Sequence, residues 1–216
     1  MLPPWLSGYD ADLRGYDYNP AKARELLAAA GYPNGTGFPV VHLWSNQQAA
    51  STQAELAAYQ KYLAAIGVQV EIHFAPDWRA FRARLEQGIL PMFRLLWIAN
   101  LPDPDSMLFP LLHSASPTNR TFYRNPRVDQ LLEQARHELD EAQRITLYRE
   151  VERIVLHDAP WITQQHTVLE YLYQPYVQGV ELSWLGSREI PLHKIWLKQS
   201  RATSAVGAIT YDEPRY

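Results

Sequence analysis

The sequence predicts an α/β fold in which a mainly parallel sheet is flanked by helices. Strand and helix patterns alternate between residues 38 and 99, and this order is typical of parallel strands joined by right-handed crossovers. The apolar run at residues 92–99 is short and follows Gly88 and Pro91, as expected of a strand buried on both faces. A Pro-rich loop comes next, and open α/β sheets bind ligands at the carboxyl ends of their strands.

Capping residues mark most of the helices. Asn19, Asp77, Asn125 and Asp140 each precede an amphipathic stretch and can accept hydrogen bonds from its first turn. The predicted helices cover residues 21–30, 50–66, 77–87, a short segment after Asp105 or Ser106, 125–139, and 140 to before Pro160. We expect the buried helix faces to include Leu26, Trp78 and Leu139.

Further strands are predicted from alternating or continuous apolar patterns. They cover residues 38–45, 68–74, 161–165 and 168–173, with residues 177–184 returning along the body of the protein. No linker divides the chain, so we expect one lobe over residues 1–198. Residues 199–216 are expected to form a loose tail or a return segment.

Composition excludes several classes of protein. The net charge of −3, with no basic block, argues against a nucleic-acid surface. The absence of cysteine excludes disulfides, zinc-thiolate sites and cysteine nucleophiles. No stretch of about 18 apolar residues predicts a membrane span. The first residues lack the basic and apolar regions of a signal peptide.

No sequence pattern predicts an enzyme. The chain has no G-x-S-x-G, P-loop, dinucleotide fingerprint or H-E-x-x-H motif, and its seven histidines are scattered. We therefore expect no catalytic residues, no cofactor and no metal site. Asp103 and Asp105 could form an acid/base pair, but they alternate with prolines in a turn, where aspartate commonly has a structural role.

Arg94 lies within the apolar run and needs an anionic or polar partner, because burial of an unpaired guanidinium is costly. One interpretation is an internal salt bridge. The other is a cation facing a cleft, where it would receive a ligand carboxylate or another anionic group. Trp97 would point to the opposite face of a regular strand, so the two share a cleft only if the strand twists or bulges.

Three segments resemble a known family in the same order along the chain. Residues 97–105 (WIANLPDPD) resemble the W-x-A-D-Y-x-D-P-[DE] motif of the family 5 extracellular solute-binding proteins. These are peptide-, dipeptide- and nickel-binding receptors of bacterial ABC importers. Residues 16–35 resemble the family's YDPEKAKQLLAEAGYPDG segment, and NPRVDQLL with HDAPWITQ resemble its later N-P-x-V-D-x-L-L and D-A-P-x-I-P-L segments.

The resemblance implies a lobe like those of periplasmic binding proteins. Members of the family are bilobed and enclose a solute between their lobes, and this chain resembles the second lobe alone. The implied partners are a peptide or small-molecule ligand, the missing first lobe and the permease subunits of an ABC transporter. The implied location is periplasmic or extracellular, with a lipoprotein tether in the full-length protein.

The resemblance also implies four ligand-binding residues. Arg94 matches an arginine near the peptide carboxylate, and Trp78 and Trp97 match aromatic positions around the cleft. Asn100 occupies the position of an aspartate that pairs with the ligand's α-ammonium group. An asparagine cannot supply that charge, so sugars, opines and other solutes stay open alongside peptides.

The resemblance leaves a second function open. The same domain type follows DNA-binding domains in some bacterial transcription regulators, where the solute shifts a conformational equilibrium. The segment upstream of the lobe in the gene would distinguish a regulator from a transport receptor. A hydrolase using Asp103 and Asp105 is a third, weaker interpretation.

Overall fold

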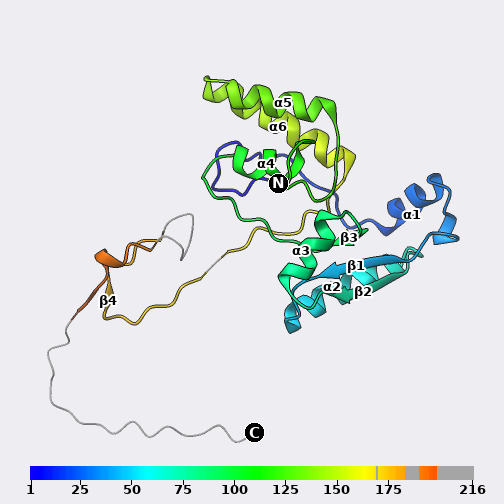
Figure 1. Ribbon diagram of the computed structural model, residues 1–216, viewed down its shortest axis with the longest axis horizontal. Helices are drawn as coiled ribbons and strands as arrows, with labels where there is room; N and C mark the ends of the chain where they lie inside the picture. Colours follow the sequence, from blue (N-terminus) through cyan, green and yellow to red (C-terminus); the bar gives the residue numbers. More distant parts are fainter. Residues whose placement is uncertain (169, 183–189, 199–216) are drawn as a thin grey trace, which may run out of the picture. The chain divides into compact units, whose positions relative to one another are not determined.

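The computed structural model describes residues 1–168, 170–182 and 190–198, and its contacts divide the chain into two units (Figure 1). The first unit is Met1–Gln165 and the second is His166–Tyr216. The α/β fold is confirmed, because the first unit contains a parallel sheet flanked by helices. The boundary that the sequence suggests at residue 198 stays a prediction.

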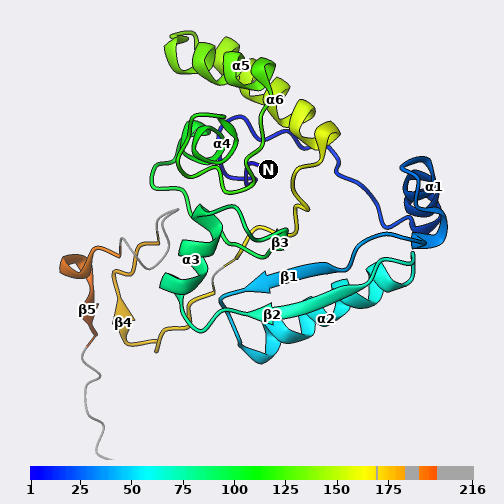
Figure 2. The same ribbon diagram turned by 45° about the vertical axis from the view of Figure 1, so that its right-hand side comes forward.

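The sheet contains three parallel strands in the order β2-β1-β3 (Figure 2). They are β1 (Val41–Ser45), β2 (Val70–Phe74) and β3 (Met92–Phe93). Helix α2 (Ala50–Ala64) connects β1 to β2, and α3 (Trp78–Glu86) connects β2 to β3. This is the predicted β-α-β-α-β order.

Alternation along the strands gives the sheet two different faces. On one face, Leu43 and Val70 are buried and pack with Leu56 of α2. On the other face, Trp44 and Phe93 pack against a cluster around α3. Successive side chains of a strand point to opposite faces, so the register of the strands decides which polar side chains meet on each face.

The predicted strand over residues 92–99 is wrong in extent. Strand β3 ends at Phe93, and the last bond to the sheet is donated by the N–H of Arg94 to the carbonyl oxygen of Trp44, at 2.8 Å. Leu96 and Ile98 are 52% and 47% exposed. The run is apolar, but in this chain it is neither paired nor buried on both faces.

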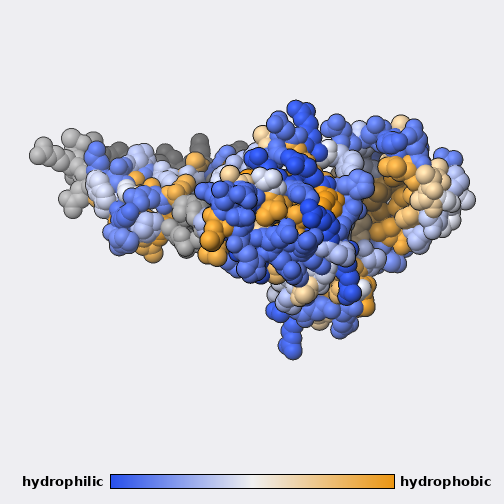
Figure 3. Space-filling view, turned by 90° about the horizontal axis from the view of Figure 1, so that it is seen from above, coloured by the Kyte–Doolittle hydropathy of each residue, from blue (hydrophilic) through white to orange (hydrophobic). Residues whose placement is uncertain are grey.

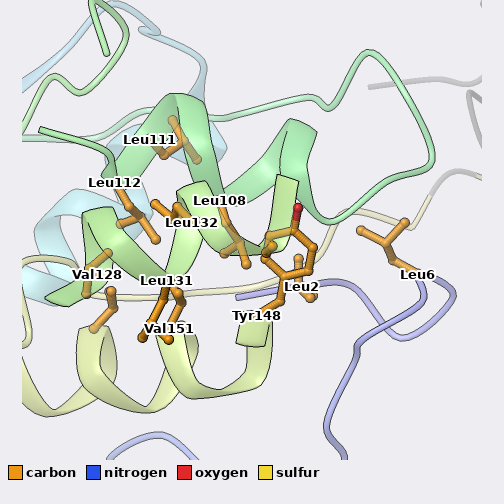
Figure 4. Packing of buried hydrophobic residues seen from close by; sticks show 12 residues of the cluster. Leu2, Leu6, Leu108, Leu111, Leu112, Val128, Leu131, Leu132, Tyr148 and Val151 are labelled. Atoms are coloured by element: carbon orange, nitrogen blue, oxygen red, sulfur yellow. The ribbon is translucent and has the colours of Figure 1, made fainter. Parts of the chain in front are cut away.

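After the sheet, the chain of the first unit forms three more helices. It contains α4 (Asp105–Leu112), α5 (Pro126–His137) and α6 (Glu141–Asp158), and α5 and α6 lie side by side (Figure 1). Their largest core cluster includes leucines from α4 and α5, Tyr148 of α6, and Leu2 and Leu6 from the N-terminal segment (Figure 4). The buried carboxylate of Glu152 accepts a hydrogen bond from the Leu2 N–H at 2.8 Å, which ties that segment to α6.

The four predicted N-caps are confirmed, whereas three of the residues predicted on buried helix faces are exposed. Each of the four side chains accepts a hydrogen bond from the first turn of its helix. The first of these helices is α1 (Pro20–Ala29), and the short 3-10 helix η1 (Pro33–Gly35) follows it. However, Leu26 and Trp78 are 60% and 50% exposed. Leu139 is 98% exposed because α5 ends at His137 and the next residue is extended.

Helix α4 begins differently from the prediction. Asp105 is its first residue rather than its cap, and the preceding Pro104 makes no side-chain capping bond. The carboxylate of Asp103 instead accepts a hydrogen bond from the Asp105 N–H at 2.8 Å.

The second unit contains one small antiparallel ladder. Strand β4 (Val177–Gln178) pairs with β5 (Trp196–Leu197), and η3 (Leu192–Lys194) lies between them in sequence. The strands predicted at residues 161–165 and 168–173 do not form among the described residues, and Leu172 is 99% exposed. Trp184, within the predicted return segment, and the predicted tail lie outside the described residues.

The surface carries separate apolar patches. In the view from above, hydrophobic residues gather in several places within a mainly hydrophilic surface (Figure 3). Within the described ranges, none of the helices has the length and apolar character needed to cross a membrane.

Candidate functional site

Arg94 forms an ion pair with Glu55 of α2. Its Nε lies 3.0 Å from each carboxylate oxygen of Glu55, and its Nη1 donates to Oε1 of Gln47 at 3.0 Å. The side chains of Arg94 and Glu55 are only 19% and 25% exposed. The internal salt bridge anticipated as one of the two interpretations is therefore present.

The ion pair belongs to a small polar network on the α2 side of the sheet. The hydroxyl of Tyr59 donates to Oε1 of Glu55 at 3.1 Å. Burial, followed by the hydrogen bond and charge of Glu55, raises the pKa of Tyr59 to about 12, although the charge of Arg94 opposes this shift. Among the described residues, the side-chain hydrogen bonds of Arg94 come from Nε and Nη1, and none comes from Nη2.

Trp97 and Asn100 belong to the loop between β3 and α4. The indole Nε1 of Trp97 donates to the carbonyl oxygen of Ser106 at 3.0 Å, and its ring packs against the core cluster of the helices. Asn100 is exposed. Ser106 fixes the same loop, because its hydroxyl contacts the carbonyl oxygens of Leu101 and Asp103 at 2.7 and 2.8 Å.

The two aspartates of this loop are held by arginines. The carboxylate of Asp103 accepts hydrogen bonds from Nη1 and Nη2 of Arg144 at 2.9 and 2.8 Å. Nε of Arg136 lies 3.0 Å from Oδ1 of Asp105. Partial burial favours protonation of Asp103. The hydrogen bonds and charge of Arg144 outweigh it and lower the pKa of this carboxyl. The bidentate pairing with Arg144 gives Asp103 a structural partner, which agrees with the structural interpretation.

The network extends to a buried phenol. The hydroxyl of Tyr148 receives a hydrogen bond from Nη2 of Arg144 at 3.0 Å. Burial is the main cause that raises the pKa of Tyr148 to about 12, and the charge of Asp105 adds to it.

The four predicted site residues do not form one contact cluster. Arg94 lies on the α2 side of the sheet, and Trp78 is half-exposed at the start of α3, near the ring of Phe81. In the part of the chain that the structure describes, no hydrogen bond, ion pair or ring contact joins any two of the four side chains. Two pockets lie elsewhere: one of about 620 Å³ between α5 and α6, and one of about 260 Å³ beside Ser114 and Arg120.

Sequence reasoning missed the partners of Arg94. Glu55 lies on a helix with many polar residues, 39 positions before Arg94, and Gln47 is in a loop. Nothing in the spacing of these residues marks them, because only the pairing of β3 with β1 brings Arg94 to the end of β1 and to α2.

Comparison with known proteins agrees with this architecture. Residues 1–119 match the family model described as bacterial extracellular solute-binding proteins, family 5 Middle. Heme-binding protein A of Haemophilus influenzae is 33% identical over 192 residues, which cover 86% of this chain and 34% of the relative. Di/tripeptide-binding protein 2 of Pseudomonas aeruginosa is 30% identical over 196 residues, which cover 89% of this chain and 37% of that relative.

A solved structure resembles the chain over most of its length. The ABC transporter-associated periplasmic binding protein DppA from Helicobacter pylori, in complex with the peptide STSA, superposes with a TM-score of 0.70 and 29% identity. The match covers 91% of this chain and 38% of that structure, so the chain spans about a third of the length of its relatives. The matched family model and these relatives place the chain among the bacterial extracellular solute-binding proteins of family 5.

Proposed function

We propose that this chain is the ligand-binding lobe of a solute-binding protein that captures peptides or a related small solute for uptake by an ABC importer. Membership of family 5 carries the proposal, and the binding proteins among its relatives support it. The lobe works by binding and closure rather than by catalysis, because binding energy is used to bring two lobes together. Its partners are a first lobe and the permease subunits of the transporter.

The location follows from the same family. The matching family is described as extracellular, and the DppA relative is described as periplasmic. These descriptions support our proposal that the working protein is periplasmic or extracellular, and we further propose that a lipid tethers the full-length protein to the membrane.

Arg94 is proposed to recognise an anionic group of the solute. Its Nε and Nη1 are held by Glu55 and Gln47, which fixes the plane of the guanidinium and leaves Nη2 as a donor. A fixed guanidinium loses little conformational entropy when it binds a carboxylate. Trp97, Asn100 and Trp78 are proposed to contribute aromatic and hydrogen-bonding contacts when the first lobe closes the cleft.

A thermal-shift titration with pools of peptides, sugars and amino acids tests the function. The chain is titrated alone and together with a separately expressed first lobe. A ligand that binds the native state raises the melting temperature by mass action. We expect a clear shift only when both lobes are present, and the active pool then identifies the class of solute. If no pool shifts the two lobes together, solute capture is contradicted.

Variants of the ion pair test the role of Arg94. Arg94→Ala should weaken binding of an anionic solute, whereas Glu55→Gln removes its partner charge and keeps the guanidinium. Arg82→Ala is the matched control, because Arg82 forms an exposed pair with Glu86 on α3. Equal affinity of the wild type and Arg94→Ala would contradict the assignment and leave the family-level function intact.

A further inference from the structure

Two histidines and a glutamate lie together on the sheet. Nδ1 of His42 is 3.0 Å from Nε2 of His73, and both nitrogens face Oε2 of Glu71, at 3.2 and 3.6 Å respectively. These are the same three atoms in all three pairs, so they form a closed triangle. No other group of three such side chains with metal-binding geometry occurs among the described residues.

The strand register produces this triangle. His42 of β1 is the Cα partner of Glu71 of β2, and His73 follows Glu71 by two positions. All three side chains therefore leave the same face of the sheet. It is the face opposite α2, because Leu43, Val70 and Ile72 point toward α2 and alternate with them.

The dimensions of the triangle fit a tetrahedral metal ion. Zinc binds imidazole nitrogen at about 2.0–2.1 Å and carboxylate oxygen at about 2.0–2.2 Å, so tetrahedral ligand atoms lie about 3.3–3.5 Å apart. The three distances between the candidate ligand atoms, 3.0, 3.2 and 3.6 Å, lie just below and just above this range. Movements of a few tenths of an ångström would bring the three atoms to ligand positions.

The surroundings favour an ordered but open site. The ring of His73 stacks on Trp44, with centroids 4.7 Å apart and planes at 20°, which restricts its orientation. The side chains of His42, His73 and Glu71 are 46%, 33% and 59% exposed, so solvent can reach a fourth position. The guanidinium of Arg84 lies 4.4 Å from the centre of the Trp44 ring and makes its contact there rather than with the three ligand atoms.

We propose that His42 Nδ1, His73 Nε2 and Glu71 Oε2 bind one divalent transition-metal ion of the zinc class, with water in the fourth position. Two imidazoles and one carboxylate are a ligand set that zinc uses in open sites. The alternative is a hydrogen-bonded pair of histidines beside a carboxylate, which needs no metal. This site lies on the other face of the sheet from Arg94, and its existence does not depend on the proposed solute.

Titration of the chain, without an affinity tag, with Zn²⁺ tests the site. Calorimetry and competition with a chromophoric chelator give the stoichiometry and affinity. We expect one ion per chain and, for His42→Ala or His73→Ala, a loss of affinity of at least about tenfold, since even outer partners of metal ligands have effects of this size. His157→Ala is the matched control, because the His157 side chain is 88% exposed and lies on α6.

Cobalt supplies an independent readout of the geometry. Co²⁺ bound by the wild type should give the intense visible absorption of a four-coordinate site, and Glu71→Gln should reduce it while the helical circular dichroism stays unchanged. If the triple variant His42→Ala, Glu71→Gln, His73→Ala binds Zn²⁺ as tightly as the wild type, the site does not exist. Absence of stoichiometric binding by the wild type overturns the proposal equally. Should an alanine variant fail to fold, His42→Gln replaces it.

Discussion

Asp103 contributes to stability through Arg144, and its substitution should reveal this in a pH-dependent way. Its pKa is lowered in the folded chain, so its contribution is present above about pH 4 and is lost as the pH falls through the folded pKa. We expect Asp103→Asn to lower the free energy of unfolding by roughly 1 kcal/mol at pH 7, because the pair is bidentate but about a third exposed.

Urea unfolding at pH 7 and at pH 3 measures this effect. The difference between wild type and Asp103→Asn should shrink at the lower pH, because the unfolded wild-type chain then binds a proton at this carboxyl that the folded chain binds less readily. Asp17→Asn is the control, because Asp17 is exposed and lies in the N-terminal segment. A difference of the same size at both pH values would mean that the ion pair with Arg144 does not contribute.

The sequence predicts that a residue requires a partner better than it predicts which residue that partner is. Arg94 within an apolar run requires an anion, and the structure supplies Glu55. The identity of that anion depends on strand pairing, which local spacing does not encode. The same limit applies to the proposed metal site: His42 and His73 are 31 positions apart in the sequence and meet only because β1 and β2 pair in a particular register.

The α5–α6 hairpin shows how the end of a helix decides which leucines are buried. Leu131 is fully buried in the core cluster, whereas Leu139 lies beyond the end of α5. We expect Leu131→Ala to lower the free energy of unfolding by about 2–5 kcal/mol, the usual effect of a buried leucine. Leu139→Ala should change it by less than about 0.5 kcal/mol.

Thermal and urea denaturation of the two variants make this comparison directly. Both substitutions remove the same atoms from a leucine, so the comparison reports chiefly on burial. Similar losses in the two variants would show that Leu139 is packed and that α5 continues further than His137.

Helices were predicted more accurately than strands for a physical reason. A helix carries its own hydrogen bonds and caps, so Asn19, Asp77, Asn125 and Asp140 locate its start from local sequence alone. A strand needs a partner. Residues 92–99, 161–165 and 168–173 have strand-like composition, yet of those that the structure describes only Met92 and Phe93 are strand residues, and they pair with β1.

The apolar residues that follow β3 are exposed on the surface of this chain. Leu95, Leu96, Ile98 and Leu101 are 37–62% exposed and follow one another closely after β3. The chain spans about a third of its relatives, and its proposed partner is a first lobe. An exposed apolar segment of this kind suits a surface that a further lobe covers.

Substitution of Leu96 and Ile98 by serine tests whether this surface is open in the 216-residue chain. Because both side chains are about half-exposed, the double variant should lose less than about 1 kcal/mol of unfolding free energy. It should also bind less of a fluorescent apolar dye and self-associate less at high concentration.

Leu108→Ser is the contrasting variant. Because Leu108 is fully buried in α4, this substitution should severely destabilise the chain. If the Leu96 and Ile98 variant were destabilised as strongly, the run would be buried as the sequence pattern first suggests. The apolar surface would then be unavailable to a first lobe.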